Sequence, residues 1–231
     1  MTFSVKDNNF YFGGRRIFLN SGEIHYFRIR RGLWDKHLDE AVSAGLKAVS
    51  TYVPWAWHEE EEGVFDVDGS SCPEKDLTGW LRKCKEHGLH AIVKPGPFIL
   101  AEFRGAGLPD WFLERYGDGV RMHTRRGVRV MSDGVSLFNK DYLEKVRLWY
   151  DQVMPVIRNH EIQAGGSVIM MQVCNEIGVF SWLARQADYG NEVRNRFISW
   201  VSGKYGTVSE VNKQWGTSYS SFDEIELPPD G

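Results

Sequence analysis

Four times along this chain, a short run of large apolar residues is followed by a stretch with helical spacing of apolar side chains. This alternation predicts a parallel sheet with right-handed helical crossovers. The expected strands are Ile17–Ser21, Ala48–Val53, Leu89–Val93 and Ser167–Val173, and the expected helices are Trp34–Ala44, Asp76–His87, Asn139–Ile157 and Asn191–Tyr205. Such an α/β fold is either an open, doubly wound sheet or part of a (β/α)8 TIM barrel.

The fourth strand carries the strongest candidate for chemistry. Its apolar run, with Gln172 as the one polar break, is typical of a strand buried on both faces. Asn175 and Glu176 then fall at the carboxyl end of that strand, where barrel enzymes place their catalytic groups. We expect Glu176 to be partly shielded from water and to act as a general acid. An exposed loop carboxylate or a helix N-terminal charge would explain the pattern equally simply.

Polar side chains follow the other expected strands as well, which favours a barrel rim over an open sheet. No G-x-G-x-x-G sequence follows the first strand and no Walker motif is present, which argues against a nucleotide-binding fold. A structural histidine or a packed tryptophan remains an alternative for some of the polar and aromatic positions. The candidate pocket residues are Glu23, His25, Trp55 and His58.

The expected strands and helices amount to about the first four to five of the eight β/α units of a barrel. We therefore expect one partial catalytic barrel domain over residues 1–231, with an N-terminal hairpin at 1–19 and barrel units over 17–231. Thr207 and Glu210 have the spacing of a capping box, which predicts a short helix that reaches Trp215.

Charge and cysteine usage exclude several classes of function. The net charge of −3 lacks the excess of basic residues that is typical of proteins that bind nucleic acid. Three scattered cysteines are too few for a disulfide framework or a zinc site, and they indicate a reducing compartment. The N-terminus lacks the apolar core of a signal peptide, and no 18-residue apolar run occurs. These features predict a soluble, cytoplasmic protein without a membrane partner.

Four motifs together resemble the first half of the catalytic barrel of glycoside hydrolase family 35, the β-galactosidases. They are SGEIHYFRI (21–29), TYVPWAWHE (51–59), KPGPFILAEFRGAGLPDW (94–111) and GGSVIMMQVCNEIG (165–178). Residues 204–225 are similar instead to family 42 of the same barrel clan. The chain departs from the usual family 35 pattern at Pro54, at Leu100 and at Phe103–Arg104.

The resemblance implies a role for each matching residue. Glu176 corresponds to the acid/base of the family, and Asn175 to the residue that binds the sugar 2-hydroxyl. Tyr52 and Glu102, with the backbone of Ala101, correspond to positions that hold galactose hydroxyls. The implied reaction is hydrolysis of a terminal β-D-galactoside with retention, on an oligosaccharide or glycoconjugate, without a metal or organic cofactor.

The nucleophile of this clan is a Glu at the end of the seventh strand, so the resemblance places it beyond residue 231. On this interpretation the isolated chain is inactive, and it could form a homo-oligomer that covers exposed strand edges. Two alternatives remain open. One is another β-glycosidase of the clan, such as a β-mannosidase or a cellulase, and the other is a truncated carbohydrate-binding module that performs no hydrolysis.

Overall fold

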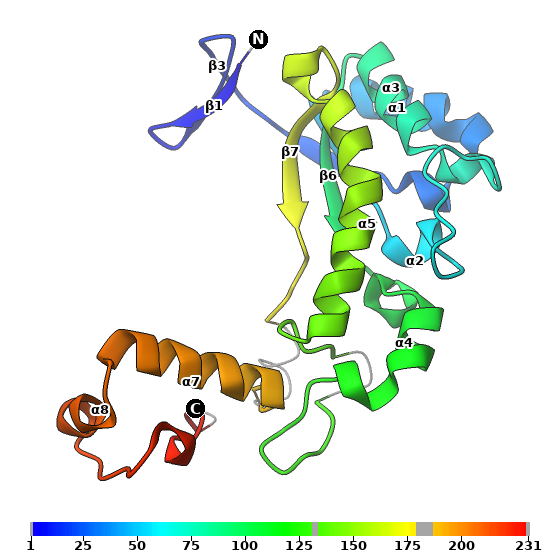
Figure 1. Cartoon of the computed structure of the whole chain (residues 1–231). Helices are drawn as coiled ribbons and strands as arrows, with labels where there is room; N and C mark the ends of the chain where they lie inside the picture. Colours follow the sequence, from blue (N-terminus) through cyan, green and yellow to red (C-terminus); the bar gives the residue numbers. More distant parts are fainter. Residues whose placement is uncertain (1, 131–133, 179–186, 230–231) are drawn as a thin grey trace. The chain divides into compact units, whose positions relative to one another are not determined.

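The computed structural model describes residues 2–130, 134–178 and 187–229. By its internal contacts the chain divides into two compact units (Figure 1). The first unit contains residues 1–115 and 146–176, and the second contains residues 116–145 and 177–231. Each is described here by itself.

The first unit is built on a parallel sheet with the strand order β4-β5-β6-β7. Its strands are β4 (Ser21–Glu23), β5 (Ala48–Tyr52), β6 (His90–Gly96) and β7 (Val168–Val173). Helices connect successive strands: α1 (Trp34–Ser43), α3 (Leu77–Glu86) and α5 (Lys140–Asn159). The strand–helix alternation predicted from the sequence is confirmed, and the strand order is that of consecutive units in a (β/α) barrel.

The start of the first core strand was predicted wrongly. Residues Arg15–Ile17 form β3, the third strand of a separate antiparallel sheet with β1 (Phe3–Lys6) and β2 (Asn9–Phe12). The turn at Gly13 and Gly14, which both have positive φ, returns the chain so that Ile17 pairs with Phe10. The barrel strand β4 begins only at Ser21, and Phe18 between the two sheets is 84% exposed.

The helices of the first unit cover the sheet with aromatic side chains. Trp34 of α1 and Trp80 of α3 meet edge to face at 5.5 Å, and both are almost fully buried. Trp149 of α5 donates a hydrogen bond of 2.8 Å to the carbonyl of Pro95 in β6. Burying such large rings against the sheet supplies much of the hydrophobic stabilisation of a domain this size.

Shorter helices fill the connections after the strands. The α-helical pieces are α2 (Trp55–His58) and α4 (Asp110–Tyr116). The 3-10 turns are η1 (Tyr26–Arg28), η2 (Arg31–Leu33), η3 (Pro73–Lys75), η4 (Arg104–Gly107), η5 (Gly117–Val120), η6 (Ile162–Ala164) and η7 (Phe222–Glu224).

The second unit contains α7 (Asn191–Tyr205) and α8 (Val208–Trp215), which pack around Val201, Val211 and Ile225. The predicted cap of α8 is confirmed, because the Thr207 hydroxyl accepts a hydrogen bond of 3.2 Å from the backbone N–H of Glu210. Among the described helices, none combines the length and the apolar character needed to cross a membrane.

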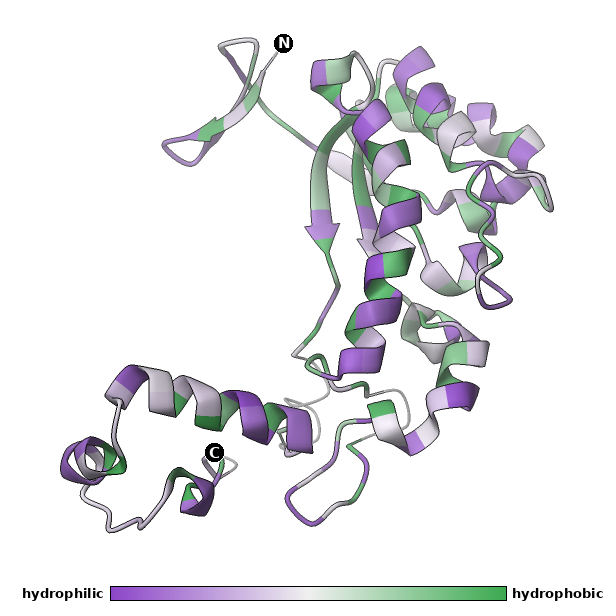
Figure 2. Cartoon of the chain, in the orientation of Figure 1, coloured by the Kyte–Doolittle hydropathy of each residue, from purple (hydrophilic) through white to green (hydrophobic). Residues whose placement is uncertain are grey.

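The burial of β7 differs from the sequence-based prediction. Val168 is buried, but Met171, Gln172 and Val173 are exposed. Figure 2 shows that this strand is hydrophobic along most of its length. It is exposed because β7 is an edge strand of the sheet, with β6 on one side and no further strand on the other among the described residues. The expectation of burial on both faces is therefore wrong for its carboxyl-terminal half.

Candidate active site

The carboxyl ends of the four parallel strands bring polar side chains to one edge of the sheet. Glu23 is the last residue of β4, Tyr52 is the last residue of β5, and Lys94 lies near the end of β6. Tyr52 and Lys94 are register partners in adjacent strands. Asn175 and Glu176 follow β7. This edge is the rim predicted from the sequence.

Charges at the rim act on one another. Lys94 forms an ion pair with Glu23, and its ammonium nitrogen lies 4.3 Å from the centre of the Tyr52 ring. Burial raises the pKa of Tyr52, Lys94 lowers it, and the carboxylates of Glu23 and Glu176 raise it. Tyr52 is therefore a neutral hydroxyl at physiological pH, able both to donate and to accept a hydrogen bond.

His25 belongs to the same cluster. Its ring packs against Tyr52 and Phe27, with a distance of 5.3 Å between ring centres in each case. Burial lowers the pKa of His25, and the cations of Arg28 and Lys94 lower it further, against the opposing effect of Glu23 and Glu102. Its Nδ1 atom is buried and has no hydrogen-bond partner among the described residues. A neutral imidazole with a free nitrogen suits contact with a ligand hydroxyl.

The loop after β6 holds its residues in a strained conformation. Leu100, Ala101 and Glu102 have φ values of 53°, 50° and 48°, which non-glycine residues rarely adopt. Arg28 donates a hydrogen bond of 2.6 Å to the carbonyl of Ala101, which secures the middle of the turn. Strain of this kind persists only where the surroundings enforce it, and it concentrates at functional sites.

Asn175 ties the end of β7 to this loop. Its backbone N–H bonds to the carbonyl of Phe98 at 2.9 Å, and its side-chain Nδ2 donates to the carbonyl of Ile99 at 2.9 Å. Gln172 donates to the Asn175 Oδ1 at 3.0 Å. The carboxamide is thus fixed in one orientation, with a second N–H and a second oxygen lone pair left to bind a ligand.

Glu176 is exposed, whereas the sequence predicts partial burial. It follows an edge strand, so no neighbouring strand covers it in the described residues. Its φ of 52° departs from regular strand geometry. This carboxylate nevertheless acts on the ionisation of Tyr52, so the two groups belong to one electrostatic neighbourhood.

Two candidate pocket residues are core residues instead. Trp55 and His58 are both 0% exposed. The indole N–H of Trp55 donates to Glu59, and the His58 ring lies between the Tyr26 hydroxyl and the carbonyl of Asp66. Pocket lining by Trp55 and His58 is therefore wrong, and the packing and structural-histidine alternatives hold. Both residues belong to α2, which begins directly after its N-cap residue Pro54.

Sequence reasoning missed two residues that shape the site, Lys94 and Gln172. Gln172 is the lone polar residue of an apolar strand, and Lys94 follows the apolar run Ala91–Val93; these interruptions were the available signal. A polar side chain in such a strand must point to an open face or find a partner, because burial without one is costly. Lys94 has Glu23 as its partner, and Gln172 has Asn175.

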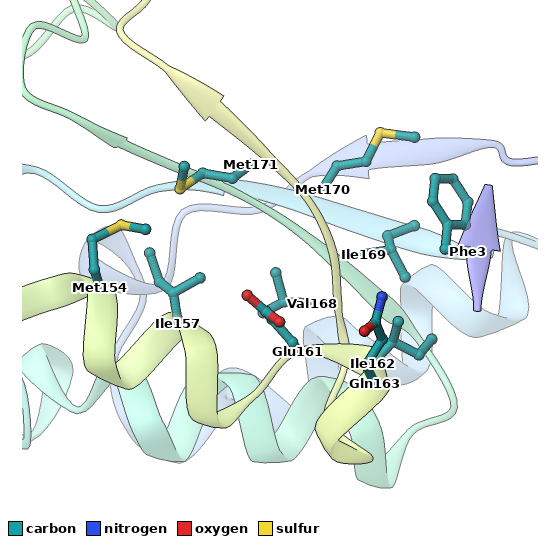
Figure 3. A pocket seen from close by; sticks show the side chains of 10 residues that line it. All are labelled: Phe3, Met154, Ile157, Glu161, Ile162, Gln163, Val168, Ile169, Met170 and Met171. Carbon is teal, nitrogen blue, oxygen red and sulfur yellow. The ribbon is translucent and has the colours of Figure 1, made fainter. Parts of the chain in front are cut away.

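An apolar groove of the first unit lies elsewhere, and Figure 3 shows its lining. It has a volume of about 210 Å³ and lies between α5, η6 and β7. Apolar side chains such as Met154, Ile157 and Ile169 line it, and Glu161 is its acidic member. The groove contains none of the rim residues, so we do not assign the catalytic chemistry to it.

No group of three or more His, Cys, Asp or Glu side chains gathers as a metal site in the described ranges. The three cysteines are free thiols, with Cys84 buried and Cys72 and Cys174 partly exposed.

Comparison with known proteins identifies the family. The profile of the glycosyl hydrolases family 35 matches residues 9–224. A β-1,2-glucosyltransferase of Ignavibacterium album is 42% identical over 93% of this chain and 30% of its own length. Mouse β-galactosidase is 35% identical over 77% of this chain and 24% of its own length.

A solved structure agrees on the fold. The β-galactosidase of the psychrophilic Marinomonas ef1 superposes with a TM-score of 0.72 at 22% identity, over 91% of this chain and 30% of that chain. The present chain thus spans about a third or less of the length of these proteins. The family profile nevertheless extends over nearly all of it. The chain belongs to the glycosyl hydrolases family 35.

Proposed function

We propose that the protein containing this chain is a retaining β-glycosidase that cleaves terminal β-D-galactosides, with Glu176 as its acid/base. The observation that carries this proposal is the Asn175–Glu176 pair at the carboxyl end of β7. Hydrogen bonds hold Asn175 to the loop that leads into the strained residues 100–102, and Glu176 acts electrostatically on Tyr52. Membership of family 35 and the likeness to mouse β-galactosidase support it.

In the proposed mechanism, Glu176 protonates the oxygen of the leaving group while a second carboxylate attacks the anomeric carbon. Glu176 then takes a proton from the water that hydrolyses the glycosyl-enzyme. Retaining enzymes keep their two carboxyl groups about 5–5.5 Å apart. The second carboxylate is expected from polypeptide beyond residue 231, as the resemblance implies. The open side of β7 leaves Glu176 accessible to such a partner.

The remaining rim residues would bind the sugar. The neutral amide of Asn175 suits a 2-hydroxyl group better than a 2-ammonium group, which would favour a carboxylate. Tyr52, Glu102 and the Ala101 backbone would hold further hydroxyls. The partner of this protein is accordingly the non-reducing end of an oligosaccharide or glycoconjugate.

The test is the variant Glu176→Gln in the longest polypeptide that contains this chain. We expect hydrolysis of lactose, which has a poor leaving group, to fall about 10²–10⁴-fold, because general acid catalysis contributes that much. Hydrolysis of a dinitrophenyl galactoside should fall far less in its first step, since that leaving group needs no proton.

Glu114→Gln is a matched control, because Glu114 is an exposed carboxylate on α4. It should leave both rates unchanged. Equal loss on both substrates in Glu176→Gln, or full activity on lactose, would remove Glu176 from the acid/base role. A panel of nitrophenyl galactosides, glucosides, mannosides and glucosaminides then tests the sugar preference.

Glycosyl transfer is a second candidate, favoured by the 42% identity to the β-1,2-glucosyltransferase of Ignavibacterium album. The first step is the same, but a sugar hydroxyl in place of water takes the glycosyl group from the intermediate. With a β-glucoside donor and glucose as acceptor, a transferase makes a disaccharide faster than it releases free sugar. Product analysis over time separates the two reactions.

A further inference from the structure

Lys94 occupies an unusual position for a lysine. In β6 the alternate residues Ala91 and Val93 are fully buried, so Lys94 lies on the opposite face of the sheet with Ile92. Its side chain is only 14% exposed. Lysines are almost never buried to this extent unless they are paired, because desolvating the ammonium group is costly. The pairing of Lys94 therefore needs an explanation.

Glu23 of β4 and Tyr52 of β5 contact the ammonium group of Lys94. Glu23 forms an ion pair with it, and the Ser50 hydroxyl of β5 donates to the same carboxylate oxygen of Glu23 at 3.4 Å. The ring of Tyr52 lies beneath the ammonium nitrogen at 4.3 Å, within the range of a cation–π interaction. Lys94 thus links the ends of β4, β5 and β6 at the rim.

One partner of Lys94, the carboxylate of Glu23, is open to solvent, whereas the other, Tyr52, is largely buried. The side chain of Glu23 is 42% exposed, and its residue lies on the same edge as the proposed sugar-binding residue Tyr52. A structural ion pair deep in a core would have no such open partner. The ammonium group of Lys94 thus contacts a phenol ring on one side and pairs with a carboxylate that remains accessible to a ligand.

We propose that Lys94 is a positioning residue of the sugar site, whose ammonium group holds Glu23 and the Tyr52 ring in the orientation that receives hydroxyls of the terminal sugar. This inference rests on the proposed glycosidase function and adds two residues to it. Glu23 becomes a direct sugar contact, and Lys94 acts through Glu23 and Tyr52 without touching the scissile bond.

The kinetic test uses Lys94→Met and Lys94→Arg in the longest polypeptide that contains this chain. Lys94→Met should raise KM for nitrophenyl β-galactoside about tenfold with a smaller change in kcat, as expected when ground-state and transition-state binding are lost equally. The loss should be the same for lactose, unlike that of Glu176→Gln. Lys94→Arg should recover part of the affinity, because a guanidinium pairs with a carboxylate and stacks on a ring.

Lys36→Met is the matched control, since Lys36 lies on α1 with a side chain that is 67% exposed. It should leave KM unchanged. If Lys94→Met does not fold, Glu23→Gln replaces it, and the same rise in KM is expected. Wild-type protein without glycosidase activity would overturn the proposed function, whereas active protein with unchanged KM in Lys94→Met and Glu23→Gln would overturn only this inference.

A second readout needs no activity. Four charged groups act on His25, namely Glu23, Arg28, Lys94 and Glu102. Lys94 lowers the pKa of His25, so Lys94→Met should raise the midpoint of the His25 titration in NMR spectra of the 231-residue chain. Lys36→Met should not. An unshifted His25 midpoint in Lys94→Met would show that the ammonium charge of Lys94 does not act on the sugar site, and it would contradict the positioning role.

Discussion

At the scale of single residues, two histidines of this chain have different roles because their surroundings differ. His25 at the rim keeps a free ring nitrogen, whereas both nitrogens of His58 are engaged in the core. The carbonyl of Asp66 can only accept, so Nδ1 of His58 carries the hydrogen and Nε2 accepts from the Tyr26 hydroxyl. His58 is therefore neutral in the folded protein, and burial lowers its pKa to about 4.

This arrangement makes stability depend on pH. Below its ordinary pKa of 6.5 the imidazole takes a proton in the unfolded chain but not in the folded one. The stabilisation is fully present above pH 6.5 and is lost as the pH falls towards about 4. The lost free energy of unfolding should reach about 3 kcal/mol. Urea unfolding of the chain between pH 7 and pH 4 measures it.

A variant isolates the contribution of His58 from that of other groups. His58→Gln should be less stable at pH 7, but its free energy of unfolding should fall less between pH 7 and pH 4 than that of the wild type. The contribution of Asp66 to stability is lost only as the pH falls below 3.8. Burial raises the pKa of Asp66, but hydrogen bonds from Ser71, Gly69 and Ser70 hold it far below its ordinary value of 3.8. Parallel pH profiles of wild type and His58→Gln would contradict this account.

At the scale of elements, caps and turns decide where each helix begins. Asp76 starts α3: its Oδ1 accepts from the backbone N–H of Gly79 at 2.6 Å, and its Oδ2 pairs with Arg31 at 2.6 Å. A Cβ at position 79 would lie 2.2 Å from that carboxylate, so the glycine leaves room for the cap. The cap starts a helix that packs against β6, the strand that carries Lys94 to the rim.

Removing this cap should destabilise the first unit. We expect Asp76→Ala to lower the free energy of unfolding by about 1–2 kcal/mol, because it leaves the Gly79 N–H and the Arg31 guanidinium without their partner. Asp76→Asn is the matched control. It keeps a capping oxygen and loses only the ion pair, so it should cost less. Chemical denaturation measures both, and equal effects of the two variants would contradict a capping role.

At the scale of the whole molecule, the parallel sheet has an open side. Met171 and Val173 of the edge strand β7 are 40% and 59% exposed, beside unpaired backbone groups. Exposed apolar edge strands favour pairing between chains. The division into two units concerns contacts within the described residues and does not test the prediction of a single barrel domain.

We expect the 231-residue chain to self-associate at about 100 µM, a range in which exposed strand edges drive association. Met171→Lys should weaken this association, because a charge on an edge strand opposes pairing. Gln152→Lys adds the same charge on the exposed face of α5 and should have little effect. Sedimentation velocity measures the three proteins. A compact monomer in the wild type would contradict the expectation.

Much of the fold could be predicted from local patterns. The apolar spacing of Trp34, Leu38 and Ala41 predicted α1, and a terminal glycine marked the end of most helices. The spacing of apolar residues shows which side of a helix or strand is buried, so it locates individual helices and strands well. It started the first core strand too early, at Ile17, because a short run such as Arg15–Ile17 fits either sheet until the Gly13–Gly14 turn pairs it with β2.

The candidate site was only partly predictable. The position of Asn175 and Glu176 directly after β7 was predicted correctly, because a strand end is visible in the sequence as the last residue of an apolar run. By itself the sequence determined the alternation of strands and helices, the family and the residues at each strand end. Only the tertiary structure decided that Lys94 meets Glu23 and Tyr52, that Gln172 holds Asn175, and that His58 and Trp55 are core residues. Such contacts join side chains far apart in the chain, and their partners are set by strand register and burial, which no local pattern encodes.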